Sequence, residues 1–177
     1  MRELNDLLDD RGVLLTSRWD DVRLTHPLLV FLQRKTARVD VGQLSVCAER
    51  YFDTRLGLMV PKRYEGAAGE LRDLTLLAVA PPERDAVTVP VLTRLATAAD
   101  HALALALEAE QGGGGLGLLA RRCEAVAEVD SGAGDELALR VAAIFAQTHL
   151  GPVVAPAARQ LFGVKTARER LLALRGD

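Results

Sequence analysis

Aromatic side chains are scarce in this chain: its 177 residues include four Phe, two Tyr and one Trp, which together make up 4% of the sequence. A core that is poor in aromatics must be built from aliphatic side chains. The apolar fraction of 49% consists mainly of Leu, Ala and Val, and these residues suit close packing of helices better than a sandwich of strands. The composition therefore favours an all-α fold.

A charge excess of either sign is also missing, because the formal net charge is −2 with 26% charged residues. No global field would draw the chain towards nucleic acid or an anionic membrane. Residues 1–30 contain no apolar signal region, and no segment approaches the ~18 uninterrupted apolar residues of a membrane span. We therefore expect a soluble, cytoplasmic protein without membrane contact.

The sequence predicts no metal site and no cofactor. Cys47 and Cys123 each fall within an apolar helical pattern and lack CxxC or Cys/His spacing. Buried thiols are the favoured interpretation, and a disulfide between them is left open. Asp6, Asp9 and Asp10 share one face of a short predicted helix. A solvated face explains them better than Mg²⁺, which needs further oxygen ligands.

Hydrophobic periodicity predicts about eight helices and no convincing sheet. The predicted helices cover the approximate ranges 4–10, 28–32, 41–52, 71–78, 88–110, 118–129, 137–149, 157–162 and 167–174. Asp40 and Gln43 form a plausible capping pair before the helix at 41–52, and Thr166 with Glu169 a capping box before the last helix. We expect a helical bundle with an N-terminal helical lobe (residues 1–83) and a C-terminal helical bundle (residues 84–177).

Two segments resemble turns of a known family. Residues 56–66, with Leu56, Gly57, Val60, Pro61, Tyr64 and Gly66, resemble the turn in the N-terminal helical domain of acyl-CoA dehydrogenases, and Gln160, Leu161 and Gly163 resemble a turn near that family's C-terminus. The resemblance implies the N- and C-terminal helical parts of the acyl-CoA dehydrogenase superfamily. The middle β domain of the family would be absent, because the chain is too short to hold it.

This sequence departs from the family at the positions that serve catalysis. The family has a glycine pair where this chain has Glu65 and Gly66, and another where it has Gly163 and Val164. Its catalytic glutamate has no counterpart at a matching position. Flavin-dependent dehydrogenation by this chain alone is therefore not expected, and no flavin is predicted.

The functional hypothesis is a truncated acyl-CoA dehydrogenase-like protein that binds an acyl thioester or a small apolar molecule. It would act as a biosynthetic enzyme of reduced size, without the middle domain, or as an accessory subunit of a complete flavoprotein. His149, placed near a helix C-terminus where the dipole favours a cation, and Tyr64 are the candidate catalytic residues. Arg63, Gln160 and Phe162 are the candidate ligand-binding residues.

Charge patterning suggests partners of a similar kind. Residues 34–63 hold seven cations and three anions, which suits phosphopantetheine, CoA or an acidic carrier protein, although a solvated helix face explains the pattern equally well. Alanine-rich faces at 98–106 and 138–146 could form a homodimer interface or belong to the internal core.

The alternative function is DNA binding. Residues 157–168 also resemble a helix-turn-helix with Gly163 and Val164 at the turn, and Lys165, Arg168 and Arg170 would lie on its second helix. A helix-turn-helix regulator is therefore the second hypothesis.

Overall fold

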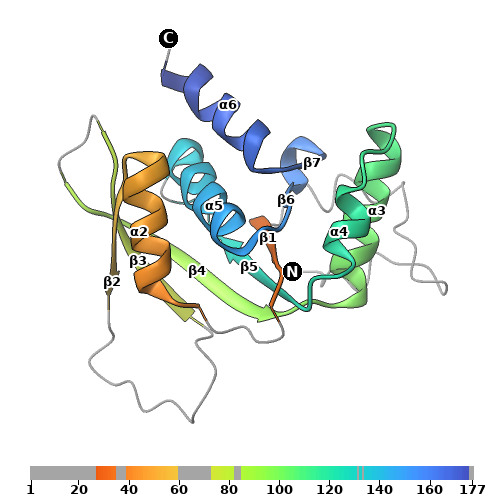
Figure 1. Cartoon of the computed structure of the whole chain (residues 1–177), viewed down its shortest axis with the longest axis horizontal. Coiled ribbons are helices and arrows are strands. Elements are labelled where there is room, and N and C mark those ends of the chain that lie inside the picture. Colours follow the sequence, from red (N-terminus) through yellow and green to blue (C-terminus); the bar gives the residue numbers. More distant parts are fainter. Residues whose placement is uncertain are drawn as a thin grey trace.

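The computed structural model describes residues 27–34, 39–59, 73–81, 85–130, 132 and 134–175. Within this part of the chain, seven strands form one sheet and five α-helices pack against it (Figure 1). The predicted all-α bundle of about eight helices is therefore wrong, and the fold is of the α/β type.

The sheet is antiparallel at every pairing of neighbouring strands. Its spatial order is β2-β3-β4-β5-β1-β6-β7. The strands are β1 (Leu28–Leu32), β2 (Arg55–Met59), β3 (Asp73–Val79), β4 (Val87–Leu95), β5 (Ala125–Val129), β6 (Val153–Ala155) and β7 (Gln160–Phe162). The first strand in sequence thus lies inside the sheet, between β5 and β6.

Strand β1 is buried on both of its faces. Val30 and Leu32 belong to the larger core cluster, whereas Leu29 and Phe31 belong to a second, smaller one. Alternate residues of a strand point to opposite faces, so the uninterrupted apolar sequence of β1 supplies two cores at once. The sheet must therefore be covered by helices on both sides here.

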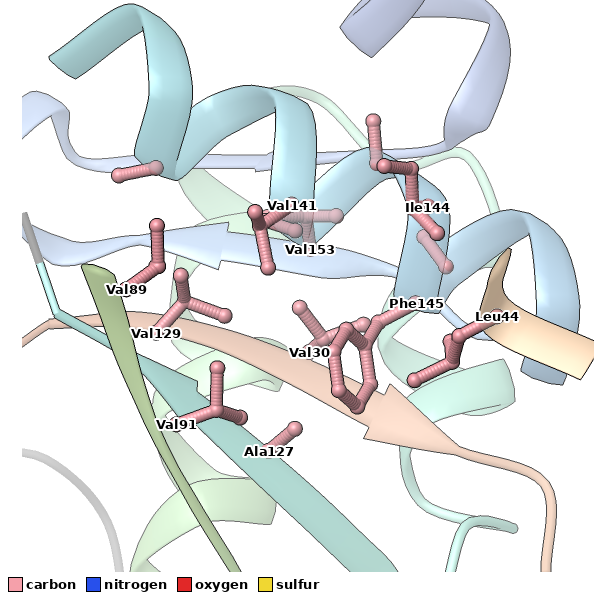
Figure 2. Packing of buried hydrophobic residues seen from close by; sticks show 14 of the residues in the cluster. Val30, Leu44, Val89, Val91, Ala127, Val129, Val141, Ile144, Phe145 and Val153 are labelled. Carbon is pink, nitrogen blue, oxygen red and sulfur yellow. The ribbon is translucent and has the colours of Figure 1, made fainter. Parts of the chain in front are cut away.

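Two groups of helices provide this cover. Helices α2 (Val41–Phe52), α5 (Asp135–His149) and α6 (Val164–Arg175) contribute to the larger cluster, and α3 (Ala98–Glu110) contributes to the smaller one, next to the short helix α4 (Leu116–Ala120). Figure 2 shows Val141, Ile144 and Phe145 of α5 over Val30 of β1. Helix α5 is thus the main cover of the central strands.

Three predicted helices are confirmed as helices, at α2, α5 and α6. The predicted cap of α2 is also present, because the Asp40 side chain accepts a hydrogen bond from the Gln43 amide at 3.2 Å. Helix α6 begins at Val164, before Thr166. The capping box predicted for Thr166 and Glu169 therefore does not mark the start of that helix.

Other predicted helices are strands in the structure. Residues 28–32 form β1, 71–78 contain most of β3, the predicted helix at 88–110 divides into β4 and α3, and that at 118–129 divides into α4 and β5. Because β1 is buried on both faces, its sequence lacks the alternation of apolar and polar residues that marks a half-exposed strand. In β4, Pro90 suggests the start of a helix in the sequence, but it lies within a strand. The predicted first helix at 4–10 lies outside the described residues.

The segments that carried the family resemblance are likewise extended. Leu56 and Gly57 lie in β2, and Gln160 to Phe162 form β7. The residues before β7 form a single 3₁₀ turn, η4 (Pro156–Ala158), where a helix was predicted. The helical surroundings that the resemblance implied are therefore not found at these positions.

The predicted boundary between two helical lobes at residue 83 falls between paired strands. Strand β3 precedes it and β4 follows it, with Leu76 opposite Val89 in the register. The alanines of α5 at 138, 142, 143 and 146 are fully buried in the larger core cluster. This alanine face therefore packs inside the protein and is not exposed to a partner. Formation of a homodimer stays a prediction.

Gly151 marks a very close approach between two backbone segments. A Cβ atom built at this residue would overlap the carbonyl oxygen of Phe31 in β1. The neighbouring Pro152 carbonyl accepts a hydrogen bond from the Phe31 amide at 3.0 Å, and the His149 carbonyl accepts one from the Gln33 amide at 3.2 Å. The absence of a side chain at Gly151 lets the end of α5 pass directly along β1.

We predict that Gly151→Ala lowers the free energy of unfolding by about 3 kcal/mol, because the new methyl group must displace the backbone of β1. Urea denaturation of the purified variant measures this loss. Gly57→Ala is the matched control, since a Cβ there would lie at an ordinary 3.8 Å from the Leu77 side chain and should change stability by less than about 1 kcal/mol. Equal effects of the two substitutions would contradict the close approach.

Candidate functional site

The candidate catalytic residue His149 lies at the C-terminal end of α5 with 3% of its surface exposed. Neither ring nitrogen has a hydrogen-bond partner, and the ring centre is 6.0 Å from that of Phe145. Burial, and secondly the positive charge of Arg34, lower the pKa of His149 to about 4. The imidazole is therefore neutral at pH 7, so the helix dipole does not keep it as the cation that we expected.

The other candidates from the sequence do not join His149 in one site. Gln160 pairs with Ala155 in the β6–β7 ladder, and Phe162 is buried with the Arg170 guanidinium 4.1 Å from its ring centre. No hydrogen bond or ring contact connects His149 with either residue in the described part of the chain. Tyr64 and Arg63 lie outside the described residues.

An open cavity of about 430 Å³ lies between α2 and α6, and we call it the α2–α6 groove. The last turn of α2 and its C-cap line it with residues 49–53, α5 contributes Arg140, and α6 contributes Arg168, Leu171 and Leu172. Leu171 is buried in the core, whereas Leu172 is 68% exposed. The groove thus combines an apolar wall with arginine and aromatic side chains.

Arg140 connects α5 to the end of α2. Its side chain is 2% exposed, its Nη1 donates a hydrogen bond to the Phe52 carbonyl at 3.0 Å, and its Nη2 forms an ion pair with Glu136. The Phe52 carbonyl belongs to the last turn of α2, where carbonyl groups lack partners within the helix. Arg140 therefore completes the end of α2, and Glu136 balances its charge.

Arg168 is placed differently, because its guanidinium lies on aromatic rings. Its Cζ atom is 5.1 Å from the ring centre of Tyr51 and 5.2 Å from that of Phe52. Among the described residues it has no ion pair, and its buried Nε has no hydrogen-bond partner. Arg50 approaches the same Tyr51 ring at 5.2 Å. Arg168 is thus a half-buried cation in the groove without an anionic partner in the described structure.

Two carboxylates stand at the rim of the groove. Glu49 and Asp53 both line it and are both exposed. Asp53 ends α2 in the left-handed conformation with φ 49°, and its backbone amide donates to the Ala48 carbonyl. The charges of the groove are therefore mixed: Arg140 and Arg168 lie deeper in the structure, and the exposed Arg50, Glu49 and Asp53 lie at the solvent edge.

A second charged cluster, between β4 and α3, has a structural role. Asp100 is fully buried and accepts hydrogen bonds from Arg94 at 2.6 and 2.8 Å and from the Thr97 amide at 2.7 Å. Burial raises the pKa of Asp100, but the bonds from Arg94 and Thr97 outweigh it and hold the pKa below its usual value. Since Arg94 also pairs with Glu128 at 2.6 Å, its charge is balanced within the fold.

The cysteines are free and buried, as the favoured interpretation expected. Burial raises the pKa of the Cys123 thiol to about 11, so it stays protonated at neutral pH. In the described ranges, no group of three or more His, Cys, Asp or Glu side chains is placed to hold a metal ion. None of the helices found there has the length and apolar run that crossing a bilayer would need.

The groove residues were missed in the sequence. Arg140 follows Leu137 by three residues and precedes Ile144 by four, so it interrupts the apolar stripe of its helix. This buried position could have been recognised as unusual for an arginine. No comparable signal points to Arg168, because its contacts with Tyr51 and Phe52 join residues more than one hundred positions apart.

Comparison of the chain with protein-family models, with curated proteins and with solved structures finds no match.

The lowered pKa of His149 predicts a pH-dependent stability. Protonation is easier in the unfolded chain, with a pKa near 6.5, than in the folded one, with a pKa of about 4. The contribution of neutral His149 is therefore fully present above pH 6.5 and is lost as the pH falls towards 4. Urea denaturation at pH 7 and pH 5 should show a smaller difference for His149→Met than for the unchanged chain. Phe145→Leu, the control, changes the ring beside His149 but keeps the histidine, and it should keep the full difference.

For the buried cluster, we predict that Asp100→Ala destabilises the protein by about 3 to 5 kcal/mol, because Arg94 loses a buried partner and the capping box of α3 loses its Asp100 side chain. Thermal and urea unfolding measure the change. Glu110→Ala removes the half-exposed pair with Arg159 and should cost less than about 1 kcal/mol. A loss at Asp100 no larger than that at Glu110 would exclude the assigned structural role.

Proposed function

We propose that this protein binds a small acyl compound, such as an acyl thioester, in the α2–α6 groove. The observation that carries the proposal is the composition of the groove: the Leu171 and Leu172 wall lies beside the Tyr51 and Phe52 rings and the Arg168 guanidinium. Ligand sites typically combine a mostly apolar lining with a few placed polar groups in about 300 to 1,000 Å³. The groove, at about 430 Å³, falls in the lower part of that range.

The proposal concerns ligand binding alone, and it is compatible with both functional hypotheses from the sequence, an enzyme and an accessory subunit. The acyl group must be bound first in each version: by a biosynthetic enzyme of reduced size, by an accessory subunit of a flavoprotein, or by a partner of an acyl carrier protein. His149 lies outside the lining of the groove, so no catalytic role for it enters the proposal. The free thiols Cys47 and Cys123 fit a reducing compartment, and we accordingly assign the protein to the cytoplasm as part of this proposal.

No observation favours the DNA-binding alternative. A helix-turn-helix needs two consecutive α-helices, whereas the residues before Gly163 form the 3₁₀ turn η4 and strand β7. Only α6 of the expected pair is an α-helix. Arg168, which was expected to face DNA, instead lies over Tyr51 and Phe52.

The proposal is tested by calorimetric titration with compounds that share an eight-carbon chain: octanoate, 1-octanol, octyl phosphate and octanoyl-CoA. At least one of the two acyl compounds, octanoate or octanoyl-CoA, should bind with one molecule per chain, and the other two carry the same chain without the acyl carbonyl. Leu172→Ser should weaken binding about fivefold, which corresponds to about 1 kcal/mol for partial loss of an apolar contact. Because Leu172 is exposed, the substitution should leave folding intact.

Leu174→Ser is the matched control on the same helix. Leu174 is also an exposed leucine, at 53%, but it does not line the groove. Its substitution should leave the affinity unchanged. Binding of neither acyl compound, or equal losses for the two leucine variants, would remove the groove as the acyl site.

A further inference from the structure

The groove contains one cation whose charge the described structure does not balance. Arg168 is half-buried, has no ion pair among the described residues, and has a buried Nε without a hydrogen-bond partner. A guanidinium removed from water without an anion loses hydration that ring contacts restore only in part. Its planar fork of N–H donors matches two oxygens of an oxyanion. The geometry therefore points to a negatively charged ligand group at Arg168.

The other arginines of the groove do not compete for this role. Arg140 is paired with Glu136 and occupied by the Phe52 carbonyl. The hydrogen bond from Arg140 also satisfies the Phe52 carbonyl at the end of α2. It therefore offsets part of the negative charge that the α2 dipole places beside Arg168. Arg50 also lines the groove and contacts the Tyr51 ring, but it is exposed, so water screens its charge. Arg168 is thus the half-buried cation of the groove that has no ion pair in the described structure.

The rim of the groove limits the charge of that ligand. Glu49 lines it and is exposed, so it repels an anion through water, by roughly 1 kcal/mol per unit charge at 4 Å. A negative charge paired with half-buried Arg168 is attracted in a less screened environment than the one in which the exposed Glu49 repels it. The repulsion at the rim would be about twice as large for a doubly charged phosphate ester, and larger still for CoA with its several phosphates.

We propose that the ligand of the α2–α6 groove is a monocarboxylic acid with an unbranched apolar chain. Its carboxylate is held by Arg168 above the Tyr51 and Phe52 rings, and its chain lies on Leu171 and Leu172. This inference rests on the proposed acyl-binding function and narrows it from acyl compounds in general to free carboxylates. Glu49 acts as a selectivity residue that disfavours phosphate-bearing head groups.

The test is the same eight-carbon series, titrated into the unchanged chain, Arg168→Gln and the control Lys165→Gln. Lys165 lies on the same helix, is 91% exposed and does not line the groove. The unchanged chain should bind octanoate at least about tenfold more tightly than 1-octanol, and more tightly than octyl phosphate or octanoyl-CoA. Arg168→Gln should abolish the preference for octanoate over 1-octanol while keeping the affinity for the alcohol. Lys165→Gln should preserve the whole ranking.

A second variant covers the case in which Arg168→Gln fails to fold. Arg168→Lys keeps the charge but lacks the planar fork, so it should retain a reduced preference for octanoate. Equal binding of octanoate and 1-octanol, or tighter binding of the phosphate or CoA compound, overturns the carboxylate assignment and leaves the acyl-binding function standing. A preference for octanoate that survives in Arg168→Gln also overturns it. Failure of all four compounds to bind overturns both.

Discussion

Burial of strand β1 on both faces is the constraint on which the rest of the described structure depends. Its side chains alternate between two core clusters, with Phe31 in one and Val30 in the other. A strand in this position loses its stability unless helices exclude water from both sides of the sheet. Helices α5 and α3 supply this cover (Figures 1 and 2). The close passage of Gly151 along Phe31 then fixes where α5 ends relative to the sheet.

The position of the α2–α6 groove follows from the packing of α5. Most of α5 is apolar and buried, but Arg140 near its beginning is a buried cation that reaches the end of α2. Helix α6 packs on α5 as well and brings Arg168 over the rings at the end of α2. The groove is therefore held by three helices whose relative positions the sheet and α5 determine, and not by an independent loop.

The arginines of the described structure show two ways of handling a partly buried charge. Arg94 and Arg140 are balanced internally, by Asp100 with Glu128 and by Glu136 respectively. Arg140 also joins α5 to the end of α2 through its hydrogen bond to the Phe52 carbonyl. Arg168 has aromatic contacts but no described anion. This difference separates structural arginines from the one to which we assign ligand binding.

The sequence by itself determined α2, α5 and α6, because a 3.6-residue apolar period and a capping side chain at Asp40 are local signals. It also determined that both cysteines are buried. The sheet depended on tertiary structure. In β1 the apolar run carries no alternation, and in β5 the helix-forming residues Ala125 and Ala127 are buried in the larger core cluster. The site depended on it as well, since Arg168 meets Tyr51 and Phe52 only when distant segments pack together. The local apolar period indicates which residues are buried, but strand pairing and contacts between distant segments determine which residues they are buried against.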